Sequence, residues 1–228
     1  MLWVTAQPAT TAHEQVVSSS ELALAGVTPD AAAIAVGRST ERLADDFYSV
    51  MASLEVASDP RASSLSPNLL PGRAVPIGTG KRTDGTEHAY HFAHFLARAA
   101  TDSHLSAEFQ RTWTAGVVLG LGDDLAANNY FDHAPELELV CHLRHGIAHG
   151  NSFSFTSGGL HRLEKYPALN LLAWIRGDLK SEFLITPELS GMPVLFEFMG
   201  PADVPDLIMS VGGYLIRMGN GDPLRPGE

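Results

Sequence analysis

The chain has 228 residues, of which 45% are hydrophobic and 18% are charged. This length and composition predict a globular protein of one domain with extensions or of two small domains, and exclude a disordered solvating chain. The 26 acidic and 15 basic residues give a formal net charge of −11. That charge argues against a non-specific nucleic-acid coat, because such binding depends on Lys and Arg that neutralise phosphates. It leaves a local site open.

The cysteine content, the length of the apolar runs and the N-terminal segment narrow the class of protein further. A single cysteine, Cys141, excludes an intrachain disulfide and Cys-rich zinc modules. No apolar run approaches the roughly 18–20 residues of a membrane span. No basic residue precedes Arg38, so neither a secretory signal nor an Arg-rich transit peptide is indicated. We therefore expect a cytoplasmic protein that does not enter a membrane.

In the first half of the chain, apolar spacing predicts helices separated by a long loop. Residues 1–36 are rich in Ala, Thr and Ser and predict a loose arm, with at most a short helix near its end. A helix is predicted over Arg38–Ala57, and a Pro- and Gly-rich loop over 58–83. The next helix is predicted over Thr86–Ala100. Another begins near Leu105, and its glycines predict an end near Leu121 and a restart at Asp123.

The second half of the chain combines two predicted helices with less regular segments. A helix is predicted from Pro135 to about His149, with Gly150 and Asn151 as its C-terminal stop. Further predictions are short strands at 153–155, 181–186 and 194–199, a helix or strand at 169–175, a closing helix at 203–218 and a tail at 220–228. The fold class is thus mainly α, a bundle of about five helices with a few short C-terminal strands. It forms a single helical domain over residues 37–219.

Arg144 occupies the centre of the apolar face of the predicted 135–149 helix. At about 100° per residue it lies among apolar neighbours, namely Leu137, Val140, Cys141 and Ala148. Burying an unpaired charge is costly, so Arg144 needs a carboxylate partner, or its face must open onto a cleft or a second subunit. A purely structural ion pair is an equally open interpretation.

Three histidines form a second stripe beside Arg144: His142, His145 and His149. An Arg with adjacent imidazoles suits phosphate-ester chemistry, because Arg binds phosphate oxygens in a fork and His transfers protons near neutral pH. The structural alternative makes His142 a packing or surface residue. A zinc site on the three imidazoles is a further alternative, although i and i+7 meet one metal only with strain and no fourth ligand is evident.

A second histidine group, His88, His91 and His94, falls on the predicted 86–100 helix. These residues are either a polar, partly packed helix face or, if the helices pair suitably, a source of an imidazole near Arg144. The sequence leaves both possibilities open.

The segment Leu143-Arg144-His145-Gly146-Ile147-Ala148-His149-Gly150-Asn151 resembles the motif of the HEPN (higher eukaryotes and prokaryotes nucleotide-binding) superfamily, as stand-alone bacterial members carry it. That motif has Arg, a polar residue, a short spacer and then His at a helix end. The turn and amphipathic helix between Met199 and Leu215 are similar to the end of some members. His145 departs from the commonest residue, Asn, which leaves open whether His145 orients the site or takes part in catalysis.

The resemblance implies a helical bundle and a metal-independent endoribonuclease without a cofactor. It implies a homodimer whose two motifs face each other, and a toxin or phage-defence role with an antitoxin or another protein partner. In the implied reaction the RNA 2′-hydroxyl attacks the adjacent phosphate. His149 acts as base or acid, Arg144 stabilises the phosphorane, and His145 positions the phosphate or His149.

Three functional hypotheses follow: a ribonuclease, a non-catalytic HEPN-like module that binds RNA, nucleotide or protein, and an unrelated enzyme with a histidine metal site. The net charge favours the module, whereas the Arg144 and His149 pair favours the ribonuclease. The absence of Cys ligands and of a His-Glu-x-x-His helix weakens the metal hypothesis.

Overall fold

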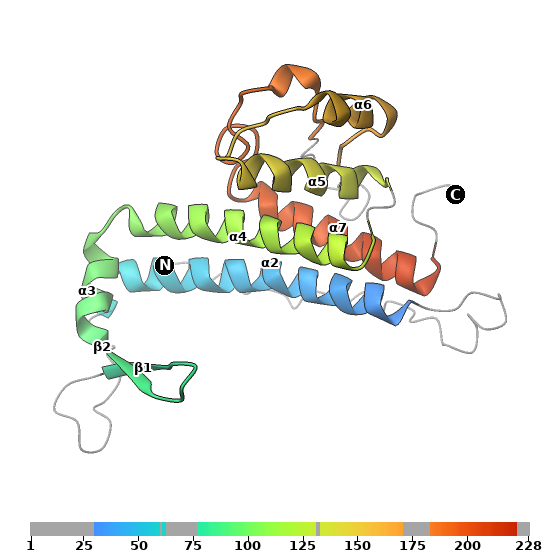
Figure 1. Cartoon of the computed structure of the whole chain (residues 1–228). Helices are drawn as coiled ribbons and strands as arrows, with labels where there is room; N and C mark the ends of the chain where they lie inside the picture. Colours follow the sequence, from blue (N-terminus) through green and yellow to red (C-terminus); the bar gives the residue numbers. More distant parts are fainter. Residues whose placement is uncertain (1–29, 60, 63–76, 131–132, 171–182, 223–228) are drawn as a thin grey trace, which may run out of the picture.

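The computed structural model describes residues 30–59, 61–62, 77–130, 133–170 and 183–222. In this part of the chain it contains six α-helices and one two-stranded sheet, which confirms the predicted mainly helical fold. Figure 1 shows α6, α5, α4 and α2 in successive tiers, with a β-hairpin and α3 projecting at one end. Among the described helices, none combines the length and the hydropathy needed to cross a membrane.

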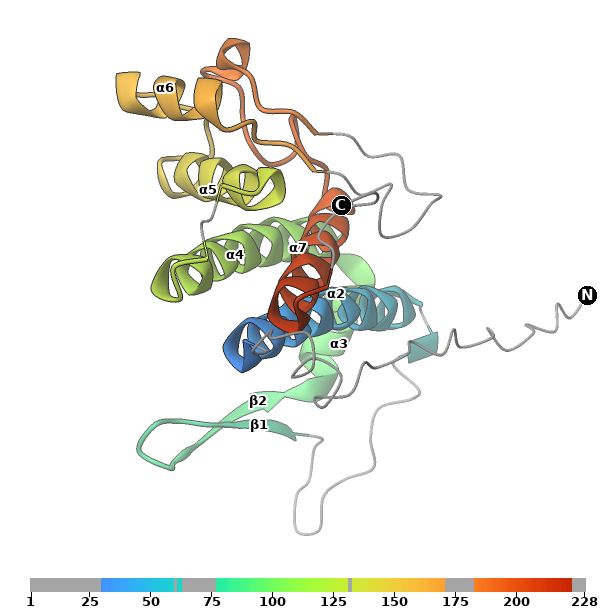
Figure 2. The same ribbon diagram turned by 90° about the vertical axis from the view of Figure 1, so that its right-hand side faces the viewer.

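Helices α2 (Ala31–Ser58) and α7 (Asp203–Asn220) pack closely against each other, and Figure 2 shows how α7 crosses α2. Asp30 caps α2, because its Oδ1 accepts hydrogen bonds from the backbone N–H groups of Ala32 and Ala33 at 3.0 Å. Residues 31–36, where the sequence left open a short helix at the end of the arm, form the first turns of this capped helix, and Ala33 is fully buried. Residues 1–29 of the predicted arm lie outside the described residues.

An antiparallel hairpin of β1 (Ile77–Lys81) and β2 (Glu87–His91) precedes α3 (Phe92–Thr101). The predicted helix over 86–100 is thus wrong in its first turns, and the predicted loop over 58–83 ends in a strand. The physical reason is a turn: the Oδ1 of Asp84 accepts from the backbone N–H and the hydroxyl of Thr86, and Gly85 has φ 82°. Residues 63–76 of the predicted loop lie outside the described residues.

Helices α4 (Leu105–Ala127) and α5 (Pro135–Ala148) are both continuous. The predicted break in α4 at 121–123 is wrong, because Leu121 and Leu125 are buried in the core and hold this stretch helical. The predicted extent of α5 is confirmed, as is the closing helix, which α7 forms. Tertiary packing thus outweighs the low helix propensity of the glycines in α4.

The segment between α5 and α7 contains α6 (Ser157–Lys165) and the short 3₁₀ helix η3 (Pro187–Leu189). In place of the strands predicted at 153–155 and 194–199, the described residues show only isolated bridges such as Ser152–Pro193. The side chain of Asn151 makes the hydrogen bonds that a neighbouring strand would otherwise make to this segment. Its Oδ1 accepts from Leu195 N–H at 2.9 Å, and its Nδ2 donates to Leu195 O at 3.2 Å. The prediction at 169–175 falls mostly on residues outside the described part of the chain. The strand predicted at 181–186 is wrong over its described residues, 183–186, which show only the isolated bridge between Leu169 and Leu184.

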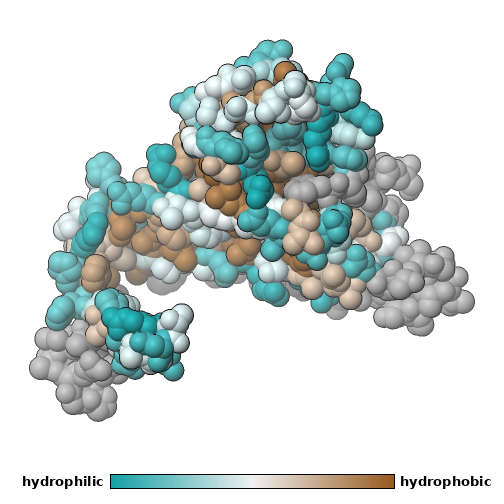
Figure 3. Space-filling view, in the orientation of Figure 1, coloured by the Kyte–Doolittle hydropathy of each residue, from teal (hydrophilic) through white to brown (hydrophobic). Residues whose placement is uncertain are grey.

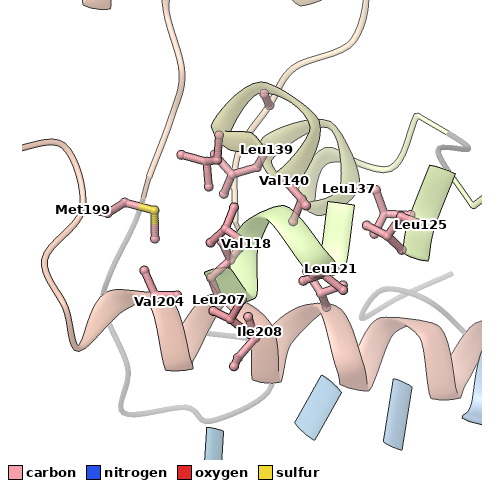
Figure 4. Packing of buried hydrophobic residues seen from close by; sticks show 14 of the residues in the cluster. Val118, Leu121, Leu125, Leu137, Leu139, Val140, Met199, Val204, Leu207 and Ile208 are labelled. Carbon is pink, nitrogen blue, oxygen red and sulfur yellow. The ribbon is translucent and has the colours of Figure 1, made fainter. Parts of the chain in front are cut away.

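The core residues labelled in Figure 4 come from three helices and one loop position. The labelled side chains are Val118, Leu121 and Leu125 of α4, Leu137, Leu139 and Val140 of α5, Val204, Leu207 and Ile208 of α7, and Met199. Each Å² of apolar surface that these side chains remove from water stabilises the fold by about 25 cal/mol. This packing fixes α5 along its length, so the end of α5 is presented from a rigid support.

Candidate functional site

The candidate site lies where α5 ends. His149 is the first residue after the helix, and its backbone N–H donates to His145 O at 3.1 Å. Gly150 (φ 94°) and Asn151 (φ 60°) then turn the chain in left-handed conformations, which confirms the predicted stop. Arg144, His145 and His149 are therefore carried by the last turn of a packed helix.

The structure brings His145 and His149 together. Their ring centroids are 4.4 Å apart, the ring planes are inclined by 53°, and both residues are exposed. Two neighbouring exposed imidazoles can accept and donate protons at one ligand, because a neutral ring offers a nitrogen acceptor and a protonated ring offers N–H donors. This pair is the geometric centre of the candidate site.

Arg144 finds the carboxylate partner that its position requires. Its Nε donates to Asp123 Oδ1 of α4 at 2.8 Å, and its Nη2 donates to the same oxygen. The two side chains are 41% and 65% exposed, so this is a surface pair rather than a buried structural one. Pairs of this kind are worth only about 0–1 kcal/mol. A phosphate can therefore replace Asp123 on the guanidinium at little cost.

Gly122 explains how an arginine fits on the inner face of α5. A Cβ at Gly122 would overlap the Cδ of Arg144, so the missing side chain lets the arginine stem lie across α4. The stem covers the neighbouring helix and the charged head reaches water. Sequence reasoning missed Gly122 and Asp123 as parts of the site, because it treated the glycines of this stretch as helix breakers.

Gly146, inside the motif, also has a packing role. A Cβ there would lie 2.6 Å from Val194 Cγ2 and 3.2 Å from Ser152 O. Its absence allows the segment after the helix to return closely along α5. Together with the Asn151 amide bonds to Leu195, this contact holds the end of α5 in place.

His142 does not join the other two histidines. It is only 8% exposed, its ring meets Phe155 edge-on at 6.0 Å, and its Nε2 has no hydrogen-bond partner among the described residues. Burial lowers the pKa of His142, which favours the neutral ring. The packing interpretation therefore describes it better than the three-histidine stripe. No group of three or more potential metal ligands is found in the described part of the chain.

The second histidine group lies far from the site. His88 and His91 are in β2 and only His94 is in a helix, so the predicted single helical face is wrong. Figure 1 shows the hairpin and α3 projecting at the end of the molecule away from α5. None of these three residues therefore supplies an imidazole to Arg144 within the chain.

A buried charge cluster at the other end of α5 was also missed. Glu138 is 1% exposed and accepts from Arg162 Nε and Nη2 of α6 at 2.6 and 2.8 Å. His133 Nδ1 lies 2.6 Å from Glu138 Oε1, and the His133 ring stacks on Tyr166 at 3.6 Å. The cluster ties α6 and the chain before α5 to the helix that carries the site.

Comparisons with protein-family models, curated proteins and solved structures found no match to this chain. The site is therefore interpreted from its own geometry and from the motif resemblance.

Changing Asp123 to Asn tests whether Arg144 is available to an anion. We expect affinity for inorganic phosphate, used as a probe anion, to rise by up to about fivefold, because a competing carboxylate worth at most about 1 kcal/mol is removed. Isothermal titration calorimetry with phosphate measures this. The matched control is Asp102→Asn, which removes the 24%-exposed carboxylate partner of Arg98 at 3.3 Å and should leave affinity unchanged. Weaker binding by the Asp123 variant would instead show that Asp123 holds Arg144 in its working position.

Proposed function

We propose that this protein is a metal-independent endoribonuclease of the HEPN type. The observation that supports the proposal is the placement of His145 and His149, exposed and with ring centroids 4.4 Å apart, at the end of the packed helix that also carries the partly exposed Arg144. The motif resemblance gives this arrangement its chemistry. Because the site is small and local, the proposal is compatible with the overall acidic charge.

In the proposed reaction, His149 accepts the proton of an RNA 2′-hydroxyl, and the 2′-oxygen attacks the adjacent phosphorus. The bond from phosphorus to the 5′-oxygen then breaks, and a protonated imidazole returns a proton to that oxygen. The products are a 2′,3′-cyclic phosphate and a 5′-hydroxyl. Arg144 stabilises the charge on the phosphorane, and His145 positions the phosphate or His149.

A second copy of the chain forms part of the proposal. Arg144 and the two imidazoles lie at an exposed end, and a homodimer would cover them and bring two motifs to one cleft. A cytoplasmic toxin or phage-defence role, regulated by an antitoxin or another protein partner, is the biological setting we propose for such an enzyme.

Labelled RNA incubated with the purified protein in EDTA tests the activity. We expect cleavage that leaves cyclic-phosphate ends, and a loss of about a hundredfold or more in Arg144→Ala and His149→Ala, the size of effect expected for a general acid–base or oxyanion group. The matched controls are Arg98→Ala, an exposed ion-paired arginine, and His161→Ala, an imidazole 80% exposed on α6. Cleavage that survives in both site variants, or that EDTA abolishes, would contradict the proposal.

A non-catalytic module that binds RNA, nucleotide or a protein partner is the second candidate function. The observation that favours it is the engagement of Arg144 by Asp123, together with the net charge of −11. RNA that is bound in the same assay without being cleaved would support this alternative.

A further inference from the structure

One face of the projecting hairpin gathers Arg82, His88 and Tyr90, and the carboxylate of Asp84 meets this face at the turn, where it accepts from Thr86 Oγ1 at 2.7 Å. The register pairs Gly78 with Tyr90 and Gly80 with His88, and side chains alternate between the two faces of a strand. Arg82 and Thr86 continue the face that carries Tyr90 and His88, since Arg82 Nη2 lies 3.1 Å from His88 Nδ1 and its Nη1 donates to Thr86 Oγ1 at 3.3 Å. Glu87 faces the opposite side. We call this set of six residues, 78, 80, 82, 86, 88 and 90, the ribbon face.

The ribbon face has an unfilled space above Gly80, next to the rings of His88 and Tyr90. A Cβ added at Gly80 would meet nothing within 4 Å. At Gly78, by contrast, the ring of its cross-strand partner Tyr90 already fills the space that a Cβ would take. Tyr90 is itself 39% exposed and is braced edge-on by Phe95 of α3 at 5.8 Å. A flat group placed over Gly80 would therefore lie beside His88 and Tyr90, within the reach of Arg82.

The chemistry of the surface favours a polar, anionic, aromatic ligand over an apolar protein partner. All residues from Gly80 to His91 are exposed. Figure 3 shows the projecting hairpin as mostly hydrophilic. Rings for stacking together with a guanidinium for phosphate are the components of single-stranded nucleic-acid sites.

We propose that the ribbon face binds single-stranded RNA, with a base over Gly80 against His88 and Tyr90 and a neighbouring phosphate on Arg82. This inference rests on the proposed function in one respect, since it makes the hairpin an arm that holds the substrate away from the candidate site. The contacts themselves do not depend on cleavage.

Anisotropy with a short fluorescein-labelled 2′-O-methyl RNA tests the proposal on the full chain, because the methyl group blocks 2′-attack and leaves binding intact. We expect Tyr90→Leu and Arg82→Gln each to weaken binding by about 5- to 30-fold, the range of one lost stack or one lost phosphate contact. Gly80→Val should weaken RNA binding to a similar extent, because the valine side chain would fill the space above Gly80. Valine is the better strand former and a Cβ at Gly80 meets no atom within 4 Å, so the circular dichroism spectrum of this variant should match that of the wild type. Thr79→Val, on the opposite face, should bind like the wild type.

The outcomes separate this inference from the proposed activity. RNA binding that is equal in the ribbon-face variants and the wild type overturns the inference and leaves the hairpin to a protein partner, whether or not unmodified RNA is cleaved. Binding that depends on the ribbon face supports the inference even if unmodified RNA is never cut, and in that case the ribonuclease proposal fails alone. A wild-type protein that binds no RNA overturns both.

Discussion

Replacing Glu138 with glutamine is expected to lower the free energy of unfolding by about 3 kcal/mol. The change keeps the shape of the side chain but leaves Arg162 without its counter-charge and removes an acceptor from His133. Breaking a buried pair is costly because the remaining charge stays desolvated. The expected value is at the low end of the usual range, since Arg162 is 36% exposed and gains some water. Urea denaturation followed by circular dichroism measures the change.

The same carboxylate should make stability depend on pH. Burial alone would raise the pKa of Glu138, but hydrogen bonds from Arg162 and His133 outweigh it and the pKa is lowered. A group whose pKa is lowered on folding stabilises the protein above its unfolded pKa, about 4.3, and loses that contribution as the pH falls through the folded value. The wild type should therefore lose stability in acid, and Glu138→Gln should lose less over the same range.

Glu164→Gln is the matched control for both measurements. Glu164 lies on α6, close to Arg162 in sequence, but is 84% exposed. Its replacement should change the free energy of unfolding by less than about 0.5 kcal/mol. If the two glutamine variants proved equally stable, the cluster would not be what ties α6 to α5.

The sequence predicts the helices whose boundaries are written locally. Pro135 can occupy a first helical turn and Gly150 can follow a helix end, so α5 is readable from end to end. The hairpin carries no such signal. Its strands are exposed on both faces and contain glycines, so the alternation of apolar and polar residues that marks a half-buried strand is missing. The pair Asp84-Gly85 is typical of a turn, but a turn alone does not distinguish a hairpin from the start of a helix.

In the candidate site, too, local sequence spacing determines one feature and tertiary packing determines another. His145 and His149 are one helical turn apart, so their proximity follows from sequence spacing alone. Asp123 is 21 residues before Arg144 and on another helix, and only the packing of α4 against α5 brings the two together. The cost of burying a charge predicts that Arg144 needs a carboxylate partner. Which carboxylate it is depends on how the helices pack, and the sequence alone does not show that.

Gly37→Leu is expected to lower the free energy of unfolding by about 3 kcal/mol or more, because it overpacks a tight helix contact. A Cβ at Gly37 would lie 2.7 Å from Gly212 O and 2.8 Å from Ile216 Cγ1 of α7. The side chain could rotate away, but the backbone oxygen could not move without separating α2 from α7. Because the same two helices cover the core, the loss should appear as a lower midpoint in thermal and urea unfolding.

Gly116→Leu on α4 is the control that isolates packing from helix propensity. A Cβ at Gly116 would meet nothing within 4 Å, and this residue is exposed in the middle of a helix. Leucine should stabilise α4 there by about 0.5–1 kcal/mol, since glycine is the poorer helix former. Opposite signs for the same substitution would show that Gly37 is required by the approach of α7. A stable Gly37→Leu protein would mean that α2 and α7 do not pack this closely in solution.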